Sequence, residues 1–177
     1  GRGMLGLTVF GNSLKDLIGY EPAPFPELGR SVNIDRARTS GVELSGRLEV
    51  GPLDARASYT WLNAVNRSEP DRGLRRLIRR PRHTMAADLA LRLGERSAIG
   101  AGVVAALARE DTDFNDFPFR RVNPGDFADG RLYGEWRISS EVALRGRLEN
   151  LFNQRYEDGY GFPALGRRAS LSLAVRR

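Results

Sequence analysis

Acidic and amide side chains alternate at Asp111, Asp113 and Asn115, a spacing that could begin a calcium-binding loop. A loop of the EF-hand type needs glycine at its sixth position and glutamate at its twelfth. This chain has Asp116 and Val122 at those positions, which excludes an EF-hand. A looser cation site is the alternative left open, but we predict no metal centre.

Other residues that could do chemistry lack the surroundings that this chemistry needs. His83 is the only histidine, so it cannot complete a zinc site or an acid–base pair by itself, and we expect it to be structural. The spacing Gly-x-Gly-x-x-Gly occurs at residues 1–6, but strand-like sequence follows it where a dinucleotide loop would open a helix. The chain has no cysteine. We therefore predict that the protein is not an enzyme, with no catalytic residue and no cofactor.

Arginine dominates the charge of this chain. The formal net charge is +6, and Lys15 is the only lysine. A basic chain can bind nucleic acid, but many of these arginines stand beside acidic residues in the same segments, so we predict no nucleic-acid partner. The densest cluster lies in one connecting segment and comprises Arg72, Arg75, Arg76, Arg79, Arg80 and Arg82. It could bind lipopolysaccharide or phosphate; a solvated loop at a membrane edge is the alternative that we favour.

Extended segments with alternating apolar and polar side chains are expected to position the charged and polar residues described above. A side-chain period of two predicts a β-strand with one apolar face. Seven segments follow this period with no charge on the apolar side, namely 42–50, 53–61, 85–93, 99–107, 132–138, 142–148 and 169–175. A weaker eighth strand contains Leu5, Leu7 and Val9. A tilted strand of about nine to eleven residues crosses a bilayer, so the lengths fit membrane strands.

The segments that connect these strands alternate between short and long. The short ones are Gly51-Pro52, Gly94-Glu95-Arg96 and Ser139-Ser140, and the long ones cover roughly 20–31, 67–81, 110–127 and 150–166. Outer-membrane barrels have short periplasmic turns and long outer loops. The alternation therefore predicts antiparallel hairpins of a transmembrane barrel. In this orientation Tyr59 and Trp61 fall at the outer membrane interface and Trp136 at the inner one.

Two other interpretations remain open from these patterns. A self-contained outer-membrane barrel of eight strands, structural or adhesive, would close without further chain. A soluble lipocalin-like binder would instead bury the apolar faces and expose the charges. The chain contains no apolar run long enough for a transmembrane helix.

Two motifs resemble those of a known family. Residues 149–157 read Glu-Asn-Leu-Phe-Asn-Gln-Arg-Tyr-Glu and precede a Gly-Arg pair, and residues 37–44 read Ala-Arg-Thr-Ser-Gly-Val-Glu-Leu. They resemble the closing N-L-F-x-x-x-Y motif and the A-x-x-x-G-V-E strand of TonB-dependent outer-membrane receptors. The matching residues are Asn150, Leu151, Phe152, Tyr156, Gly166, Arg167, Gly41, Val42 and Glu43. Together with residues 51–53, 77–81 and 113–119, the chain is most similar to the vitamin B12 (cobalamin) receptor branch, although siderophore receptors share the strand motifs.

The resemblance implies an all-β fold in the outer membrane of a Gram-negative bacterium. Residues 1–177 would form the C-terminal eight strands of an antiparallel transmembrane β-barrel of about 22 strands. Lipid and lipopolysaccharide would surround it. The plug domain, through which the TonB energy-coupling protein acts, matches nothing in this chain and would lie upstream. The chain departs from the family in ending Val175-Arg176-Arg177, where an aromatic residue is usual.

The resemblance also implies a transport function. The chain would supply barrel wall, outer loops and part of the ligand funnel for energy-coupled uptake of a cobalamin- or siderophore-like ligand. Loop aromatic and amide groups suit such a large, flat ligand. The predicted contacts are Phe114, Asn115, Phe117, Tyr156 and Tyr160. Loop packing or anchoring at the lipid edge is the alternative role for each.

Overall fold

Strands make up all the regular secondary structure that the computed structural model assigns in its described residues, 1–21, 23, 26–68, 75–115 and 118–175. They are β1 (Arg2–Glu21), β2 (Arg30–Val50), β3 (Leu53–Asn66), β4 (Arg75–Arg76), β5 (His83–Leu93), β6 (Ser97–Leu107), β7 (Asp111–Asp113), β8 (Arg120–Val122), β9 (Phe127–Arg137), β10 (Val142–Glu149), β11 (Glu157–Gly159), β12 (Phe162–Pro163) and β13 (Arg168–Val175). Within these residues, no helix is long and apolar enough to cross a membrane.

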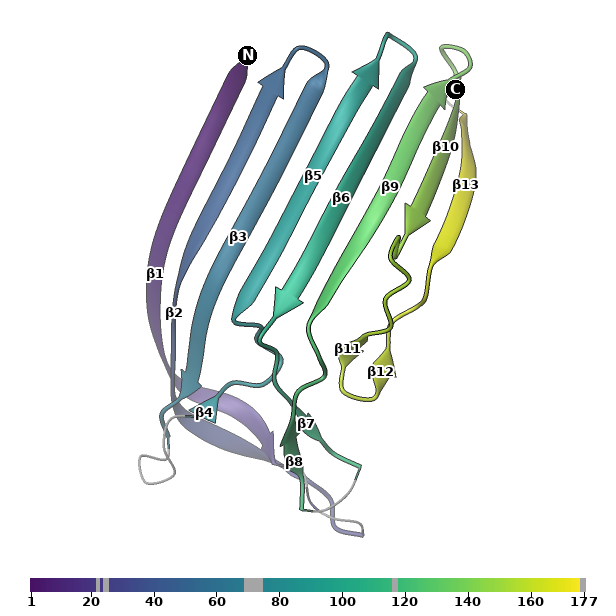
Figure 1. The fold of residues 1–177 in the computed structure, drawn as a ribbon. Helices are drawn as coiled ribbons and strands as arrows, with labels where there is room; N and C mark the ends of the chain where they lie inside the picture. The colour runs from purple at the N-terminus through teal and green to yellow at the C-terminus, as the bar shows by residue number, and fades with distance from the viewer. Residues whose placement is uncertain (22, 24–25, 69–74, 116–117, 176–177) are drawn as a thin grey trace.

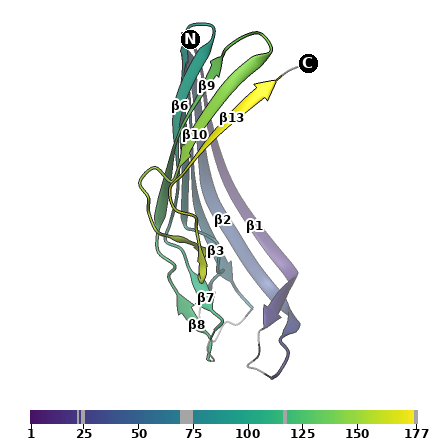
Figure 2. The same cartoon turned by 90° about the vertical axis from the view of Figure 1, so that its right-hand side faces the viewer.

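Eight long strands form one antiparallel sheet in the order β1-β2-β3-β5-β6-β9-β10-β13, and β4 pairs with the far end of β3. Figure 1 shows them side by side, with both chain termini at the end that carries the short turns. Figure 2 shows that the sheet twists and curves. In the described part of the chain, β1 and β13 are the two edges and do not pair with each other. The predicted all-β antiparallel fold is confirmed, whereas barrel closure and the total strand number stay predictions.

The connections alternate as predicted. Gly51 and Gly94 occupy short turns at φ angles of 55° and 68°, which glycine adopts without steric cost. The long connections on the other side contain β4 and the small hairpins β7–β8 and β11–β12, which the sequence analysis did not foresee. The strands β1 and β2 are also longer than predicted, at 20 and 21 residues. Their pairing continues past the apolar stretch because backbone hydrogen bonds do not require apolar side chains.

The register brings the predicted apolar positions onto one face of the sheet. Leu7 lies opposite Leu44, which lies opposite Tyr59, and Tyr59 lies opposite Met85. These side chains stay accessible; Leu89 is 49% exposed and Leu171 is 73% exposed. The buried hydrophobic residues of the described chain are only Ala37, Ala64, Val65 and Ala106. A soluble sandwich or lipocalin would bury its large apolar side chains, so this distribution supports an apolar face turned toward lipid.

Aromatic residues flank the apolar face at both ends. Toward the long loops, Trp61 lies opposite His83, and the Tyr59 hydroxyl lies 2.8 Å from His83 Nδ1. Toward the short turns, Trp136 lies opposite Ser97. The two levels are about ten residues apart along β5, or about 25 Å across the membrane at a tilt near 40°. This spacing equals the height of the apolar band expected of an outer-membrane barrel.

Candidate functional site

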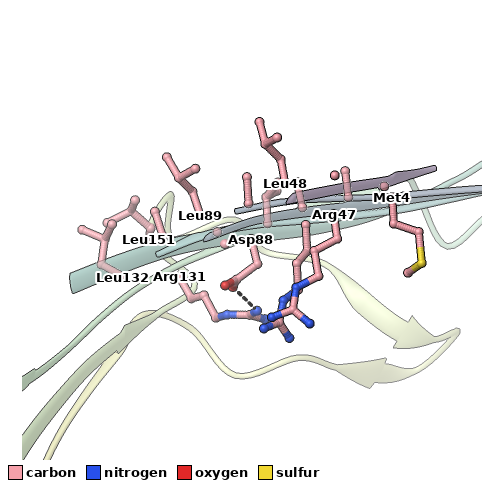
Figure 3. Close-up of a pocket in the computed structure, with 18 of the residues that line it drawn as sticks. Met4, Arg47, Leu48, Asp88, Leu89, Arg131, Leu132 and Leu151 are labelled. Atoms are coloured by element: carbon pink, nitrogen blue, oxygen red, sulfur yellow. Dashed lines mark hydrogen bonds and ion pairs between the residues drawn. The ribbon is translucent and has the colours of Figure 1, made fainter. Parts of the chain in front are cut away.

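The face opposite the apolar one carries paired charges. The Asp88 carboxylate accepts hydrogen bonds from Arg131 Nη2 and from the Tyr133 hydroxyl, both at 2.6 Å. In Figure 3, Leu48 and Leu89 extend from one side of the sheet, while Asp88, Arg131 and Arg47 extend from the other. Alternation along β5 puts Leu89 and Asp88 on opposite faces. We refer to the charged side as the lumenal face.

Three other lumenal carboxylates are also held by arginines. Each of Asp54, Glu135 and Glu149 contacts two arginines, with pairs at 2.9 Å (Arg47–Asp54), 3.0 Å (Arg56–Asp54), 3.1 Å (Arg137–Glu135), 2.8 Å (Arg145–Glu135), 3.5 Å (Arg147–Glu149) and 2.6 Å (Arg168–Glu149). Arg47 also pairs with Glu49. Three of these pairs, Arg47–Asp54, Arg145–Glu135 and Arg168–Glu149, join neighbouring strands and so favour this register. These pairs contain seven arginines and five acids, so the paired groups together carry a net positive charge.

Two glycines make room for the Asp88 cluster. A Cβ atom on Gly102 would lie 2.7 Å from Asp88 Oδ2, and a Cβ atom on Gly100 would overlap the Tyr133 ring. Glycine at these positions of β6 therefore lets side chains from β5 and β9 lie flat across it. Beside the cluster is an open hollow of about 830 Å³, whose lining includes Arg145, Arg147 and Ser170. This hollow offers guanidinium and hydroxyl donors to an anionic or oxygen-rich molecule.

The Asp111 side chain links three of the long connecting segments by hydrogen bonds. Its side chain, only 1% exposed, accepts hydrogen bonds from Arg79 Nε at 3.0 Å, from the Thr112 amide at 2.8 Å and from the Tyr160 amide at 3.0 Å. Burial would raise the pKa of this carboxyl, but these hydrogen bonds outweigh burial and hold the pKa below its ordinary value. Figures 1 and 2 both place the hairpins β7–β8 and β11–β12 close together at the loop end of the sheet.

The two residues before Asp111 strengthen this junction. Arg109, 6% exposed, donates to the carbonyl oxygens of Gly125 and Asp158. Glu110 accepts hydrogen bonds from Arg76 at 3.1 Å and from Arg121 at 2.7 Å. Part of the predicted arginine cluster is thus used in holding loops together. Arg72 and the side chain of Arg75 lie outside the described residues.

Asn150 organises the loop that follows β10. It is 2% exposed and has a φ of 48°. Its Nδ2 donates to the carbonyl oxygens of Gln154 and Leu165 at 2.9 and 3.1 Å, and its Oδ1 accepts from the Gln154 amide at 2.9 Å. Asparagine tolerates the left-handed backbone and has both donor and acceptor groups, so few other residues could replace it.

Neighbouring motif residues bind the same loop to β9. Leu151 donates its amide to the carbonyl oxygen of Gly130, and the Phe152 ring lies over Gly130, where a Cβ atom would approach it to 2.7 Å. The amide of Arg167 donates to Asn153 Oδ1 at 3.0 Å. The motif that was recognised in the sequence is therefore a connected structural unit.

Tyr156, a predicted ligand contact, is engaged inside the protein. Its ring stacks on Phe127 with centroids 4.3 Å apart, and its hydroxyl donates to Asp129 Oδ2 at 3.0 Å. Burial, followed by the hydrogen bond to Asp129, raises the pKa of Tyr156 to about 12. These contacts favour the loop-packing role that was left open for this residue.

The other predicted contacts lie around the β7–β8 hairpin and the β11–β12 loop. Phe114 is 43% exposed, and its ring centroid lies 5.7 Å from that of Phe119. The Asn115 side chain donates to Asp113 Oδ1 at 2.9 Å. Tyr160 is half-buried beside Asp111, to which its amide is bonded. Phe117 lies outside the described residues. Ligand binding by these residues stays a prediction.

The alternative of a loose cation site at Asp111 gains no support from the geometry. The carboxylate of Asp111 is directed to Arg79 and two amides, while that of Asp113 accepts from Asn115. Among the described residues, no group of three histidine, cysteine or acidic side chains is placed to hold a metal ion. Asp111 is instead part of the loop junction described above.

Comparison with known proteins agrees with this architecture. Residues 1–151 match the family described as TonB dependent receptor-like, beta-barrel. The chain belongs to the TonB-dependent receptor family. It therefore forms part of a receptor barrel in the outer membrane of a Gram-negative bacterium.

Solved TonB-dependent receptors share the fold. The copper transporter OprC superposes with a TM-score of 0.75 at 18% identity, over 99% of this chain and 28% of that one. The ferripyoverdine receptor of Pseudomonas aeruginosa gives a TM-score of 0.76 at 15% identity, over 99% and 25%. The ferric-catecholate import receptor Fiu of E. coli K12 gives 0.74 at 16% identity, over 98% and 25%. The chain thus spans about a quarter of the length of these receptors.

The second TonB-dependent receptor motif, in β2, also has a physical basis. A Cβ atom on Gly41 would lie 2.6 Å from Phe10 Cζ and would overlap the carbonyl oxygen of Trp61. Val42 is on the apolar face opposite Val9 and Trp61, whereas Glu43 is on the lumenal face between threonines of β1 and β3. Gly41 therefore admits the Phe10 ring, and the next two residues continue the two-faced pattern.

Proposed function

We propose that this chain is the C-terminal barrel segment of a receptor that takes up a siderophore-like metal chelate or cobalamin by TonB-coupled transport. The observation that carries the proposal is the two-faced sheet, with exposed leucines on one side and an arginine-rich, carboxylate-paired wall on the other. A wet lumen stabilises such charges, whereas a hydrocarbon environment would not.

The positive charge of the lumenal wall favours an anionic ligand. Ferric siderophores with carboxylate, catecholate or hydroxamate oxygens would meet guanidinium donors along the hollow beside Arg145 and Arg147. The names of the similar structures refer to copper, ferripyoverdine and ferric catecholate, which agrees with a metal chelate. Cobalamin, suggested by the sequence motifs, remains the second candidate ligand.

In this proposal the loops joined at Asp111 contribute to the outer binding surface. Phe114, Asn115, Phe117, Tyr156 and Tyr160 are its candidate contacts. An upstream plug domain would fill the lumen and transmit the force exerted by TonB. Within the described chain, β1 and β13 are unpaired edges; this supports the presence of further strands, because open strand edges are not tolerated in lipid.

Uptake measurements in a deletion strain would test the proposal. The strain, with and without the restored gene, would receive radiolabelled ferric siderophores of several classes, a copper chelate and cobalamin. We expect gene-dependent accumulation of one ligand class, abolished by a protonophore. Accumulation that resists the protonophore, or that is the same without the gene for all ligands, would contradict the proposed transport function.

A further inference from the structure

Two matching pairs of hydrogen-bond donors lie on the lumenal face of β10 and β13. Arg147 lies opposite Ser170, and Arg145 lies opposite Ser172 two residues along the same strands. Neighbouring strands are about 4.8 Å apart, and residues i and i+2 of one strand are about 7 Å apart. The four residues, all exposed, therefore mark the corners of a rectangle. We call Arg145, Arg147, Ser170 and Ser172 the donor quartet.

Most donor atoms of the quartet have no partner among the described residues. Arg145 donates from Nε to Glu135 at 2.8 Å, and Nη1 of Arg147 lies 3.5 Å from Glu149. In the described part of the chain, no hydrogen bond engages the Nη groups of Arg145, or Nε and Nη2 of Arg147, or the two serine hydroxyls. These donors are consequently able to bind a molecule in the lumen.

The nearby carboxylates do not depend on the quartet alone. Glu135 also contacts Arg137 at 3.1 Å, and Glu149 also contacts Arg168 at 2.6 Å. If the arginines of the quartet turn toward a bound anion, each carboxylate still keeps a cationic partner. The cost of this rearrangement is low, because no charge is left unpaired.

The space in front of the quartet stays open because Tyr133 turns away from it. The hollow of about 830 Å³ is lined by all four quartet residues. Tyr133 of β9 lies opposite Arg147, but its hydroxyl donates to Asp88 of β5, and its ring occupies the place of a Cβ atom on Gly100. The ring thus extends toward β6 and leaves the side that faces β10 unfilled.

The lining of this hollow carries more cations than anions, namely Arg56, Arg131, Arg145 and Arg147 against Asp88 and Glu135. Asp88 is already paired with Arg131 at 2.6 Å. An excess of guanidinium groups in a recessed wall attracts anions and raises their local concentration. The chemistry of the hollow therefore suits an oxyanion.

We propose that the hollow is an anion-binding subsite of the lumenal wall, at which the donor quartet holds two carboxylate groups of one molecule. A guanidinium can bind a carboxylate through two parallel hydrogen bonds, and each serine adds one donor. Two carboxylates about 7 Å apart would engage both Arg–Ser pairs at once. The role of the subsite as a stopping point for a chelate in transit rests on the proposed transport function, whereas anion binding does not.

Cysteine reactivity tests the subsite in the full-length receptor, freed of any other cysteine and purified in non-ionic detergent. Ser170→Cys places a thiol in the quartet and keeps both arginines. A thiosulfonate reagent with a sulfonate group should modify this thiol about tenfold faster than one with a trimethylammonium group, relative to their rates with a small free thiol. Citrate, used as a tricarboxylate probe, should slow modification by an uncharged thiosulfonate.

The test variant adds Arg145→Gln/Arg147→Gln to Ser170→Cys. It should lower the charge preference about fivefold and remove protection by citrate. Arg145→Lys/Arg147→Lys should keep the charge preference but weaken the protection, because lysine lacks the guanidinium fork. The matched control is Arg47→Gln/Arg137→Gln, which removes two arginines that do not line the hollow and that each share a carboxylate with another arginine. The control should retain the charge preference and the protection.

Three results would overturn the proposal: equal responses of the test and control variants, no protection by citrate, or a thiol that reacts with none of the reagents. The last result would show that another part of the receptor, such as the plug, covers the quartet. A heat-modifiable electrophoretic shift would verify that each variant is folded. A receptor that shows citrate protection but accumulates none of the labelled chelates or cobalamin would contradict the transport function and support the anion subsite.

Discussion

The carboxylate of Asp111 accepts a hydrogen bond of 3.0 Å from the backbone amide of Tyr160, which is 49 residues away in the chain. Arg79, from another long connection, donates to the same carboxylate. One buried side chain thus links segments that follow three different membrane hairpins. The outer loops consequently form a joined structure, and their mobility should depend on Asp111.

Substitution of Asp111 tests this dependence. Asp111→Asn removes the charge and places an NH2 group against donors, which should cost about 1–3 kcal/mol of local stability. Hydrogen exchange at the Tyr160 and Thr112 amides should accelerate by a factor of ten or more, since about 1.4 kcal/mol corresponds to tenfold. The matched control is Asp113→Asn, because among the described residues the Asp113 side chain accepts hydrogen bonds from the nearby Asn115 and joins no distant segment. Equal exchange in the two variants would remove Asp111 from its linking role.

The lowered pKa of Asp111 predicts the pH at which the loops loosen. The folded pKa lies below the ordinary value of 3.8, so the stabilisation is complete above 3.8 and is lost as pH falls through the folded pKa. Protection of the Tyr160 amide, corrected for intrinsic exchange, should therefore persist at pH 4 and decline only in more acidic solution. Decline between pH 6 and 5 would show that another group controls the junction.

Tyr156 should titrate at a higher pH than an ordinary tyrosine. Its pKa is raised to about 12 in the folded protein, so the neutral phenol stabilises the fold below pH 10 and this contribution is lost as pH rises toward 12. Ultraviolet absorbance of the phenolate should show a late-titrating component. Tyr156→Phe should reduce the amplitude of that component by one phenol. An unchanged amplitude in the variant would assign the late component to another tyrosine.

The close approach of the Tyr133 ring to Gly100 predicts that removing the ring will offset a larger side chain at residue 100. Gly100→Val should force the Tyr133 ring away from Asp88 and lower the apparent melting temperature in detergent. The double variant Gly100→Val/Tyr133→Ala should recover much of that loss relative to Gly100→Val, because the obstructing ring is gone. Strictly additive losses would show that the ring and the glycine are not in contact.

The membrane strands could be predicted because their signal is local. Alternation in each strand depends only on which face meets lipid, and antiparallel pairing through short turns then aligns Leu7, Leu44, Tyr59 and Met85. The ion pairs of neighbours in sequence, such as Arg137 with Glu135, could also be anticipated. The contact between Asp88, Arg131 and Tyr133 could not, because it depends on the register between strands.

The loop architecture was harder to predict because it is non-local. Asp111 attracted attention as part of an acidic spacing, yet its partners come from distant connections that no sequence period reveals. Tyr156 was assigned to ligand contact from its loop position and aromatic type, whereas the structure engages its ring and hydroxyl with Phe127 and Asp129. The closing motif was recognised by resemblance, and the hydrogen bonds of Asn150 now give its physical reason.

The orientation of the sheet faces can be measured directly with single cysteines, since the chain has none. Leu89→Cys and Ala90→Cys would each carry a fluorescent label in the intact protein, reconstituted in bilayers. Nitroxides on lipid acyl chains should quench the label at residue 89, and a water-soluble quencher should reach the label at residue 90. The reverse pattern, or equal quenching of both labels by acyl-chain nitroxides, would contradict an apolar face in lipid and a charged face in the lumen.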